Sequence, residues 1–182
     1  MSGILILAPK PSLCLESKYA PFLSLITSIS NHYNIDKVLI LAMCDVESAY
    51  TWNPWIVKDE PGWTRFLDIQ SYARAIHITI ATEAALQRMS WGLMQVMGTV
   101  ARELGHSTML TELCKPEVVV DLGCKKMRKL LDYYGNREDA ISAYNQGGTK
   151  KSVTGAYLNQ GYVDSVLSRM GKINEILSKG ET

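Results

Sequence analysis

The sequence predicts a single domain of the mainly α class. Several segments place apolar residues three and four positions apart, which is the spacing of one face of a helix. Residues that commonly begin and end helices flank these segments, with Asp, Asn or Pro before or in the first turn and Gly after the last. The chain has 182 residues, of which 47% are hydrophobic, so it can bury one substantial core. No repeat, low-complexity tract or linker divides it.

Residues 1–18 are predicted to form an extended arm that precedes the domain of residues 19–182. Pro9 and Pro11 disfavour a helix in this arm. The apolar run ahead of Pro9 is short and follows no Lys or Arg, unlike the core of a secretory signal peptide. We therefore expect synthesis in the cytoplasm without an export signal. No stretch reaches the roughly 18 apolar residues of a membrane span, so we expect no stable membrane insertion.

Two helices are expected in the first part of the domain. The first spans residues 19–33 and carries one apolar face, made of Phe22, Ile26, Ile29 and Tyr33. The second spans residues 37–47, "KVLILAMCDVE", with Asp36 as its N-cap. Its apolar residues face every direction, and its β-branched content would also allow a strand. Its length and its cap favour the helix.

The middle of the chain is less regular. Residues 51–66, "TWNPWIVKDEPGWTRF", contain two prolines, a glycine and three tryptophans, which predicts a loop. Residues 68–87 are ambiguous, because isoleucines alternate within a segment that otherwise suits a helix. Ser90 is then expected to cap a helix that ends at Gly105. The apolar face of that helix would be Leu93, Met97, Val100 and Leu104.

Three further helices follow. One begins at Pro116 and ends at Tyr134, with Gly135 as its stop. Its basic residues predict a solvated face: Lys125, Lys126, Arg128 and Lys129. Asn136 caps a short helix through Tyr144, which two glycines end. The last helix spans about residues 161–177, with an inner face of Tyr162, Val166, Met170, Ile173 and Leu177.

Charge and cysteine content exclude some functions. The chain has 19 Lys and Arg against 18 Asp and Glu, and this balance argues against a dedicated nucleic-acid binder. No two cysteines have the close spacing of a zinc or redox site, and the three histidines are scattered. We therefore expect free thiols and no metal or cofactor. The cysteines are Cys14, Cys44, Cys114 and Cys124.

Glu47 is the residue whose position suggests chemistry. It ends the apolar helix of residues 37–47, so loss of water disfavours its charged form, and the negative end of the helix dipole acts in the same direction. Both effects raise the pKa of its carboxyl group. A glutamic acid that stays protonated near neutral pH is what general acid catalysis of glycosidic bond cleavage requires. A structural role at the helix end is the alternative, and Glu47 alone does not decide between them.

Three sequence blocks give Glu47 a context. They are "ESAYTWNP" at 47–54, "SWGLMQVMG" at 90–98 and "AYNQGG" at 143–148. In this order they resemble the three signature blocks of the lysozyme-like lytic transglycosylase domain, the SLT type. The loop "WIVKDEPGWTRF" resembles phage-encoded members, and "LCKPEVVVDLGCKKMRKLL" resembles the helix between the second and third blocks. The resemblance covers roughly residues 35–170 and implies the helical fold of goose-type lysozyme and soluble lytic transglycosylases.

The resemblance also implies roles for the matched residues. Glu47 is implied as the catalytic acid, and Tyr144 as the residue that approaches and orients it. The remaining matched residues are implied to support or bind the substrate: Ser48, Ser90, Met94, Gln95, Asn145 and Tyr162. Taken without the family, Ser48 equally suits a backbone cap and Tyr144 equally suits packing. Without the family, Met94 is expected in the core and Tyr162 in a structural role, whereas a core Gln95 would need partners for its amide.

The implied reaction acts on the glycan strands of peptidoglycan and needs one carboxyl group. Glu47 would protonate the oxygen between N-acetylmuramic acid (MurNAc) and N-acetylglucosamine (GlcNAc), and the substrate's acetamido group would stabilise the sugar cation. Glu47 would then take a proton from the muramic acid 6-hydroxyl, which closes the ring of an anhydro-MurNAc end. Trp52 and Trp55 either stack on sugar rings or pack the loop onto the core.

Two other functions remain open. A hydrolytic muramidase like goose-type lysozyme would use a second carboxylate, for which Glu60 and Asp59 are the candidates, either turned into the groove or solvated. The second open function is that of a non-catalytic relative, a binding or structural part of a virion. The phage-like loop and the expected lack of an export signal suggest a phage or prophage product, an endolysin or a virion part, that acts in the periplasm and cell wall. We expect a monomer, and the basic helix face either meets anionic wall polymer or is solvated.

Overall fold

Helix α2 (Lys37–Glu47) lies at the centre of the described part of the chain, residues 16–180 of the computed structural model. Its residues from Val38 to Asp45 are all buried, because a helix that is apolar on every face needs neighbours on every side. Helix α1 (Glu16–His32) and helix α8 (Gln160–Gly180) both pack against it. Glu47, the last residue of α2, therefore emerges from a fully packed helix.

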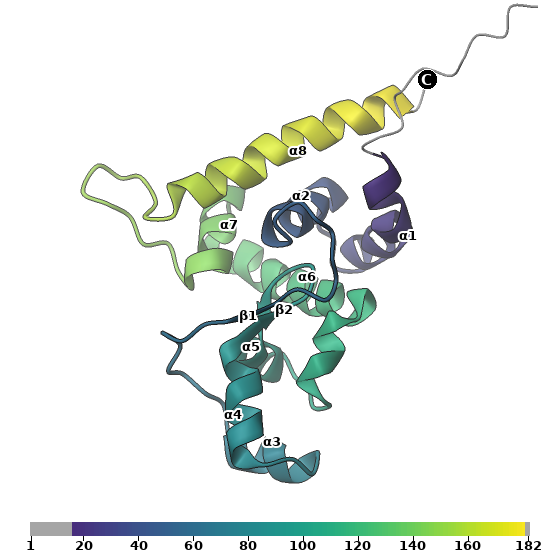
Figure 1. Ribbon diagram of the computed structural model, residues 1–182. Coiled ribbons are helices and arrows are strands. Elements are labelled where there is room, and N and C mark those ends of the chain that lie inside the picture. Colours follow the sequence, from purple (N-terminus) through teal and green to yellow (C-terminus); the bar gives the residue numbers. More distant parts are fainter. Residues whose placement is uncertain (1–15, 181–182) are drawn as a thin grey trace, which may run out of the picture.

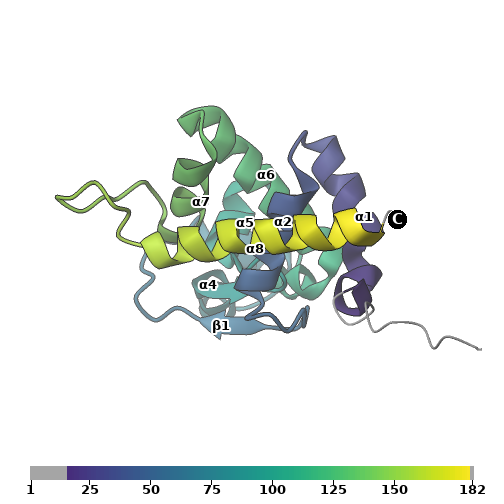
Figure 2. The same ribbon diagram turned by 90° about the horizontal axis from the view of Figure 1, so that it is seen from above.

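Helices α6 (Pro116–Tyr134) and α7 (Arg137–Gln146) complete this helical half of the molecule. Gly135 ends α6 with a φ angle of 71°, a conformation that glycine adopts without a steric penalty. The Asn136 side chain accepts a hydrogen bond from the N–H of Asp139 and so begins α7. In Figures 1 and 2, α8 runs across α2, with its first turns beside α7 and its C-terminal end near α1.

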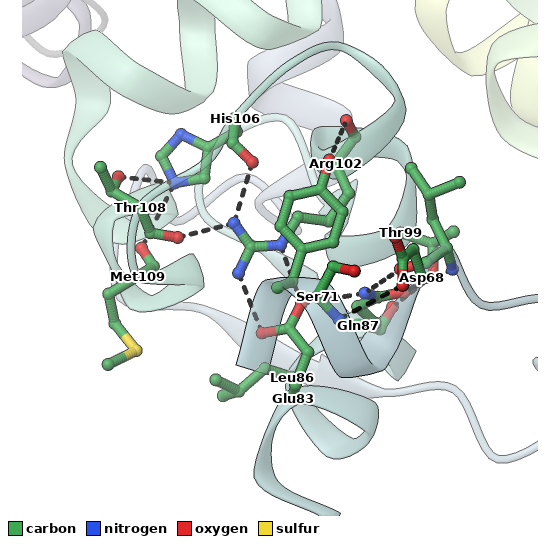
Figure 3. A network of polar contacts seen from close by, with 12 residues as sticks. Asp68, Ser71, Glu83, Leu86, Gln87, Thr99, Arg102, His106, Thr108 and Met109 are labelled. Carbon is green, nitrogen blue, oxygen red and sulfur yellow. Dashed lines mark hydrogen bonds and ion pairs between the residues drawn. The ribbon is translucent and has the colours of Figure 1, made fainter. Parts of the chain in front are cut away.

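A smaller lobe contains α3 (Ile69–Ala75), α4 (Ile80–Arg88), α5 (Gly98–Glu103) and the 3-10 helix η1 (Leu110–Cys114) (Figure 1). A fully buried ion pair joins two of its helices, because Nε and Nη2 of Arg102 on α5 donate to both carboxylate oxygens of Glu83 on α4 at 2.8 and 2.9 Å. Nη1 of Arg102 donates to the backbone carbonyls of His106 and Thr108 at 2.8 and 2.7 Å (Figure 3). These partners compensate the two charges for the loss of water.

A small antiparallel sheet connects the lobe to the helical half. Its strands are β1 (Val57–Asp59), β2 (Met89–Trp91) and β3 (Val96–Met97), in the order β1-β2-β3. Lys58 pairs with Ser90, and Ser90 pairs with Met97. Gly92 begins the turn between β2 and β3 with a φ angle of 65°, and a Cβ atom there would lie 2.4 Å from the carbonyl oxygen of Leu113. Only glycine fits this close approach.

Most of the helix predictions are confirmed. The chain is mainly helical within residues 16–180, and the expected helices at 19–33, 37–47 and 116–134 correspond to α1, α2 and α6. Asp36 caps α2 by accepting a hydrogen bond from the N–H of Val38 at 2.9 Å. The Asn136-capped helix is α7, and the predicted final helix is α8.

The predictions for the middle of the chain are wrong in detail. Ser90 does not cap a helix; it lies in β2, and the helix begins only at Gly98. The predicted loop at 51–66 contains strand β1, and the ambiguous segment at 68–87 forms most of two short helices, α3 and α4. In each case the partner strand or the packing surface lies far away in sequence, so local propensity does not reveal it.

Helix α1 begins at Glu16, so residues 16–18 belong to a helix and not to the predicted extended arm. The rest of that arm, residues 1–15, lies outside the described residues. Cys44, Cys114 and Cys124 are free and buried, as expected, and Cys14 lies outside the described residues. Among residues 16–180, every helix lacks the combination of length and apolar character that a bilayer crossing requires.

Candidate active site

A pocket of about 730 Å³ lies where the C-terminal end of α2 meets the sheet, α6 and the end of α7. The polar and aromatic residues that line it are Glu47, Lys58, Glu60, Trp63, Arg65, Ser90, Gln95, Glu103, Lys126, Lys129, Tyr144, Asn145 and Gln146. All three sequence blocks singled out above therefore contribute side chains to one cavity. Within residues 16–180, no three His, Cys, Asp or Glu side chains gather as a group that could hold a metal ion.

Glu47 reaches this pocket from the end of α2 and is half-buried. Burial raises the pKa of its carboxyl group to about 7, because the charged form loses water. A hydrogen bond from Tyr162 and the charges of Lys126 and Lys58 act in the opposite direction, whereas the charge of Glu60 raises this pKa. Near neutral pH, Glu47 therefore populates both its protonated and its charged form, as an acid that later acts as a base must do.

The residue that orients Glu47 is Tyr162, on the first turn of α8. Its hydroxyl donates to Oε1 of Glu47 at 2.6 Å. Tyr144 lies near Glu47, as expected, and both line the same pocket, but its hydroxyl does not hold Glu47, because it donates to the carbonyl oxygen of Met94 at 3.0 Å. Burial raises the pKa of both tyrosines well above its ordinary value, so both remain hydrogen-bond donors. Tyr144 connects α7 to the turn after β2, and its ring lines the pocket.

A buried carboxylate two residues before Glu47 fixes the turn that follows α2. Asp45 is fully buried and accepts from Nε1 of Trp52 at 2.7 Å and from Nζ of Lys18 at 2.8 Å. Arg169 on α8 completes its ion pairing. Sequence reasoning missed Asp45, although a carboxylate inside the apolar run "VLILAMCDV" implies a buried partner.

This anchored turn has an unusual backbone. Ala49, Tyr50 and Trp52 have φ angles of 50°, 65° and 56°, the left-handed region that residues other than glycine seldom adopt. The turn persists because the Trp52 side chain is buried, bonded to Asp45 and stacked on Phe22 with ring centroids 5.5 Å apart. Of the two roles considered for Trp52, packing the loop onto the core is therefore the one observed.

Ser48 and Trp55 do not line the pocket. The Ser48 side chain is fully buried, and its oxygen accepts a hydrogen bond from the N–H of Trp52 at 3.1 Å. Ser48 is thus a local cap of the turn, and its expected contact with substrate is wrong for this geometry. Trp55 is 71% exposed and lies outside the residues that line the pocket.

The second block supplies a polar wall. The Ser90 hydroxyl donates to Oε1 of Gln95 at 2.9 Å, and Nε2 of Gln95 donates to the carbonyl oxygen of Gly92 at 2.8 Å. Gln95 thus finds the partners that a buried amide needs, and it still lines the pocket. The expectation for the Met94 side chain is wrong: it is fully buried and packs against Gly123. Only its backbone serves the site, as the acceptor for Tyr144.

The two candidate second carboxylates are Asp59, the last residue of β1, and Glu60, the residue after it, and they point in different directions. Successive side chains of a strand point to opposite faces, so Lys58 and Glu60 reach the pocket, whereas Asp59 does not. Asp59 forms an ion pair with Arg88 at 2.7 Å on the other face. Glu60 pairs with Lys58 at 2.8 Å and accepts from Ser90 at 3.4 Å. Of the two, only Glu60 shares the cavity with Glu47.

The loop before α3 lines the pocket through Gly62, Trp63 and Arg65, and hydrogen bonds hold this loop to the smaller lobe. The Gln87 side chain accepts from the N–H of Leu67 at 2.8 Å and donates to the carbonyl oxygen of Leu67 at 2.8 Å. Nε1 of Trp63, a pocket residue, donates to Oγ1 of Thr99 at 3.1 Å. Gln87 in turn donates to Glu83, so the buried ion pair of the lobe supports this wall (Figure 3).

Two residues from α6 and α7 complete the site. Asn145 is exposed and lines the pocket, and its Oδ1 accepts from Nδ2 of Asn159 at 3.0 Å, which connects the end of α7 to the start of α8.

Lys126 was expected on a solvated face. Its Nζ instead donates to the carbonyl oxygen of Tyr144 at 2.8 Å, and burial lowers the pKa of its ammonium to about 8. Helical periodicity alone does not reveal this position, because it depends on the contact of Lys126 with Tyr144 on α7.

The model of one protein family, described as "Transglycosylase SLT domain", matches residues 24–160, about three quarters of the chain. The match includes Glu47, the sheet and all of α6 and α7, and it ends at the residue where α8 begins. No curated protein and no solved structure matches the chain.

Proposed function

The chain belongs to the transglycosylase SLT domain family of peptidoglycan lytic transglycosylases, and we propose that it cleaves the β-1,4 bond between MurNAc and GlcNAc without consuming water. The observation that carries this proposal is Glu47: a half-buried carboxyl group with a pKa of about 7, held by Tyr162 at the wall of a pocket of about 730 Å³. Such a group can give a proton and take one back at the same pH.

In the first step, protonated Glu47 donates its proton to the glycosidic oxygen. The bond between C1 of MurNAc and O4 of GlcNAc breaks, and GlcNAc leaves with the proton on O4. The developing positive charge at C1 is stabilised by the acetamido group of MurNAc itself. Glu47 is left as a carboxylate, and the Tyr162 hydroxyl at 2.6 Å stabilises this charge.

In the second step, the Glu47 carboxylate takes the proton of the MurNAc 6-hydroxyl. The O6 oxygen bonds to C1 and closes the 1,6-anhydro ring, so Glu47 is protonated again. The net change moves one proton from O6 to O4, and atoms balance without water. Gln95 and Asn145, which line the same pocket, are proposed to contact the saccharide, together with Ser90.

Mass spectrometry of digested peptidoglycan tests this proposal. We expect anhydro-MurNAc ends, which lack one water per cut, and no new reducing ends. The variant E47Q keeps the size and the hydrogen bonding of the side chain but has no acidic proton, so product should fall by at least about 100-fold. No lysis of outer-membrane-stripped cells by the wild type would refute the enzyme assignment and favour a non-catalytic relative.

A hydrolytic muramidase is the second candidate, because Glu60 lines the same pocket as Glu47. Glu60 would activate a water molecule that attacks C1, as in inverting glycosidases. Free reducing ends in the digest, lost in E60Q, would establish this alternative. The matched control is D59N, because Asp59 pairs with Arg88 outside the pocket.

We also propose a phage or prophage origin, which the likeness of the loop "WIVKDEPGWTRF" to phage-encoded members supports. The protein would then act on the wall as an endolysin or as a virion part. Immunoblots of purified virions and of the lysate distinguish these two roles. The expected monomer remains a prediction, which light scattering of the purified protein checks.

A further inference from the structure

We propose that Lys126 is a positioning residue of the active site, whose ammonium group stabilises the carboxylate form of Glu47. The role of Lys126 in the reaction rests on the proposed function above. The effect of its charge on the Glu47 carboxylate does not rest on that function, since it can be measured in the absence of substrate.

The first argument is the placement of Lys126 in the pocket. Its Nζ donates to the carbonyl oxygen of Tyr144 at 2.8 Å and lies 3.9 Å from the centre of the Tyr144 ring. These two contacts hold the ammonium group in the pocket that Glu47 also lines. A lysine on a solvated face would have neither contact.

The second argument is that Lys126 forms no ion pair with any residue in the described part of the chain. Two other cations of the pocket are neutralised, since Lys58 pairs with Glu60 at 2.8 Å and Arg65 pairs with Glu103 at 3.0 Å. Within residues 16–180, Lys126 and Lys129 are the pocket lysines that form no ion pair. Lys129 is exposed, whereas the Lys126 charge is poorly solvated and acts over a longer range.

The third argument is that Lys126 and Glu47 line the same pocket and that their charges act on each other. The charge of Lys126 lowers the pKa of Glu47, and the charge of Glu47 raises the pKa of Lys126, in each case against the effect of burial. Several other groups face Glu47 and enter the same balance: Tyr162 from α8, Tyr144 from α7, Cys44 from α2, and Lys58 and Glu60 from β1 and the residue after it. Glu103 from α5 faces Lys126. Of the two lysines in this balance, Lys58 is paired with Glu60, whereas Lys126 forms no ion pair within residues 16–180.

The consequence concerns the moment after the proton leaves Glu47. A carboxylate then forms in a poorly solvated pocket, and a cation already in place stabilises it without reorganisation. Lys126 donates its hydrogen bond to Tyr144 and forms no direct ion pair with Glu47, so it lowers the pKa of Glu47 less than a contacting cation would. Glu47 therefore remains basic enough to take the proton of the 6-hydroxyl. Lys126 therefore tunes both proton transfers.

The experiment is a pH titration of the Glu47 carboxyl carbon by ¹³C NMR, with E47Q to identify the resonance. K126M keeps the alkyl chain on the Tyr144 ring but removes the charge, and should raise the pKa of Glu47 by about one unit, a tenfold change in proton affinity. K126R should stay near the wild type. K129M is the matched control, one turn along α6 in the same pocket, and should leave the pKa of Glu47 unchanged.

The pH dependence of kcat/KM on peptidoglycan provides the second readout. In K126M the alkaline limb should move up by the same amount as the pKa of Glu47, and K126R should restore it. An unchanged Glu47 titration in K126M, even with activity lost, would overturn the proposal. If circular dichroism shows K126M unfolded, K126Q replaces it, since its amide can still donate to Tyr144. A wild type without product would refute the proposed function alone, because the titration still decides the coupling.

Discussion

Replacing Tyr162 by Phe removes the hydroxyl that donates to Oε1 of Glu47 at 2.6 Å and retains the ring. A hydrogen bond to a charged group contributes about 1.5–3 kcal/mol, and one pKa unit corresponds to about 1.4 kcal/mol. Because this bond stabilises the carboxylate, Y162F should raise the pKa of Glu47 by about one to two units, to about 8–9. The freed carboxyl group also loses its orientation, so kcat should fall by about 10–100-fold.

The assay combines the ¹³C titration of Glu47 with the pH profile of peptidoglycan cleavage. The alkaline limb of kcat/KM should move up in Y162F. The control is Y144F, because the Tyr144 hydroxyl donates to the backbone of Met94 and not to Glu47. Y144F should lose about 1 kcal/mol of stability and leave the pKa of Glu47 in place. A larger effect on Glu47 in Y144F than in Y162F would refute the assignment of Tyr162 as the orienting residue.

The remaining predictions concern stability. The pKa of Glu47 rises from 4.5 to about 7 on folding, so this group favours the folded state at low pH and does so progressively less as pH rises toward 7. E47Q should therefore be more stable than the wild type at about pH 8 and similar to it at about pH 5. The same difference in the free energy of unfolding at both pH values would contradict this prediction. R102M leaves the fully buried Glu83 carboxylate unpaired and should cost about 3–5 kcal/mol in urea denaturation, whereas an unchanged midpoint would refute the role of the pair. G92A must adopt a φ angle of 65° and place a Cβ atom 2.4 Å from the carbonyl oxygen of Leu113, so it should lower the free energy of unfolding by at least about 2 kcal/mol. In G105A the φ angle is also positive, at 97°, but the space around the Cβ position is open, so the difference between G92A and G105A estimates the steric part.

Local features of the sequence predicted the helical half of the fold. Asp36, Gly135 and Asn136 act on backbone groups within three or four residues, so a cap or a stop can be identified from its own neighbourhood. The same holds for the environment of Glu47. The apolar residues before it determine a buried helix, and the last residue of such a helix is a poorly solvated place for a carboxyl group.

The sheet was not predictable in this way. Ser90 lies in a strand because β2 pairs with residues 57–59, which are some thirty positions earlier in the chain. Neither segment alternates apolar and polar residues over a length that distinguishes a strand from a loop. The pairing nevertheless decides the chemistry, since it turns Glu60 toward the pocket and Asp59 away from it.

The sequence by itself determined the candidate acid, its buried helix and the three blocks that gather around one pocket. The tertiary structure decided that Tyr162 and not Tyr144 holds Glu47, that Met94 and Ser48 face inward, and that Lys126 faces the pocket. The reason is physical. Burial of a helix and its caps depend on neighbours in sequence, whereas the partner of a side chain depends on which faces of distant helices pack together.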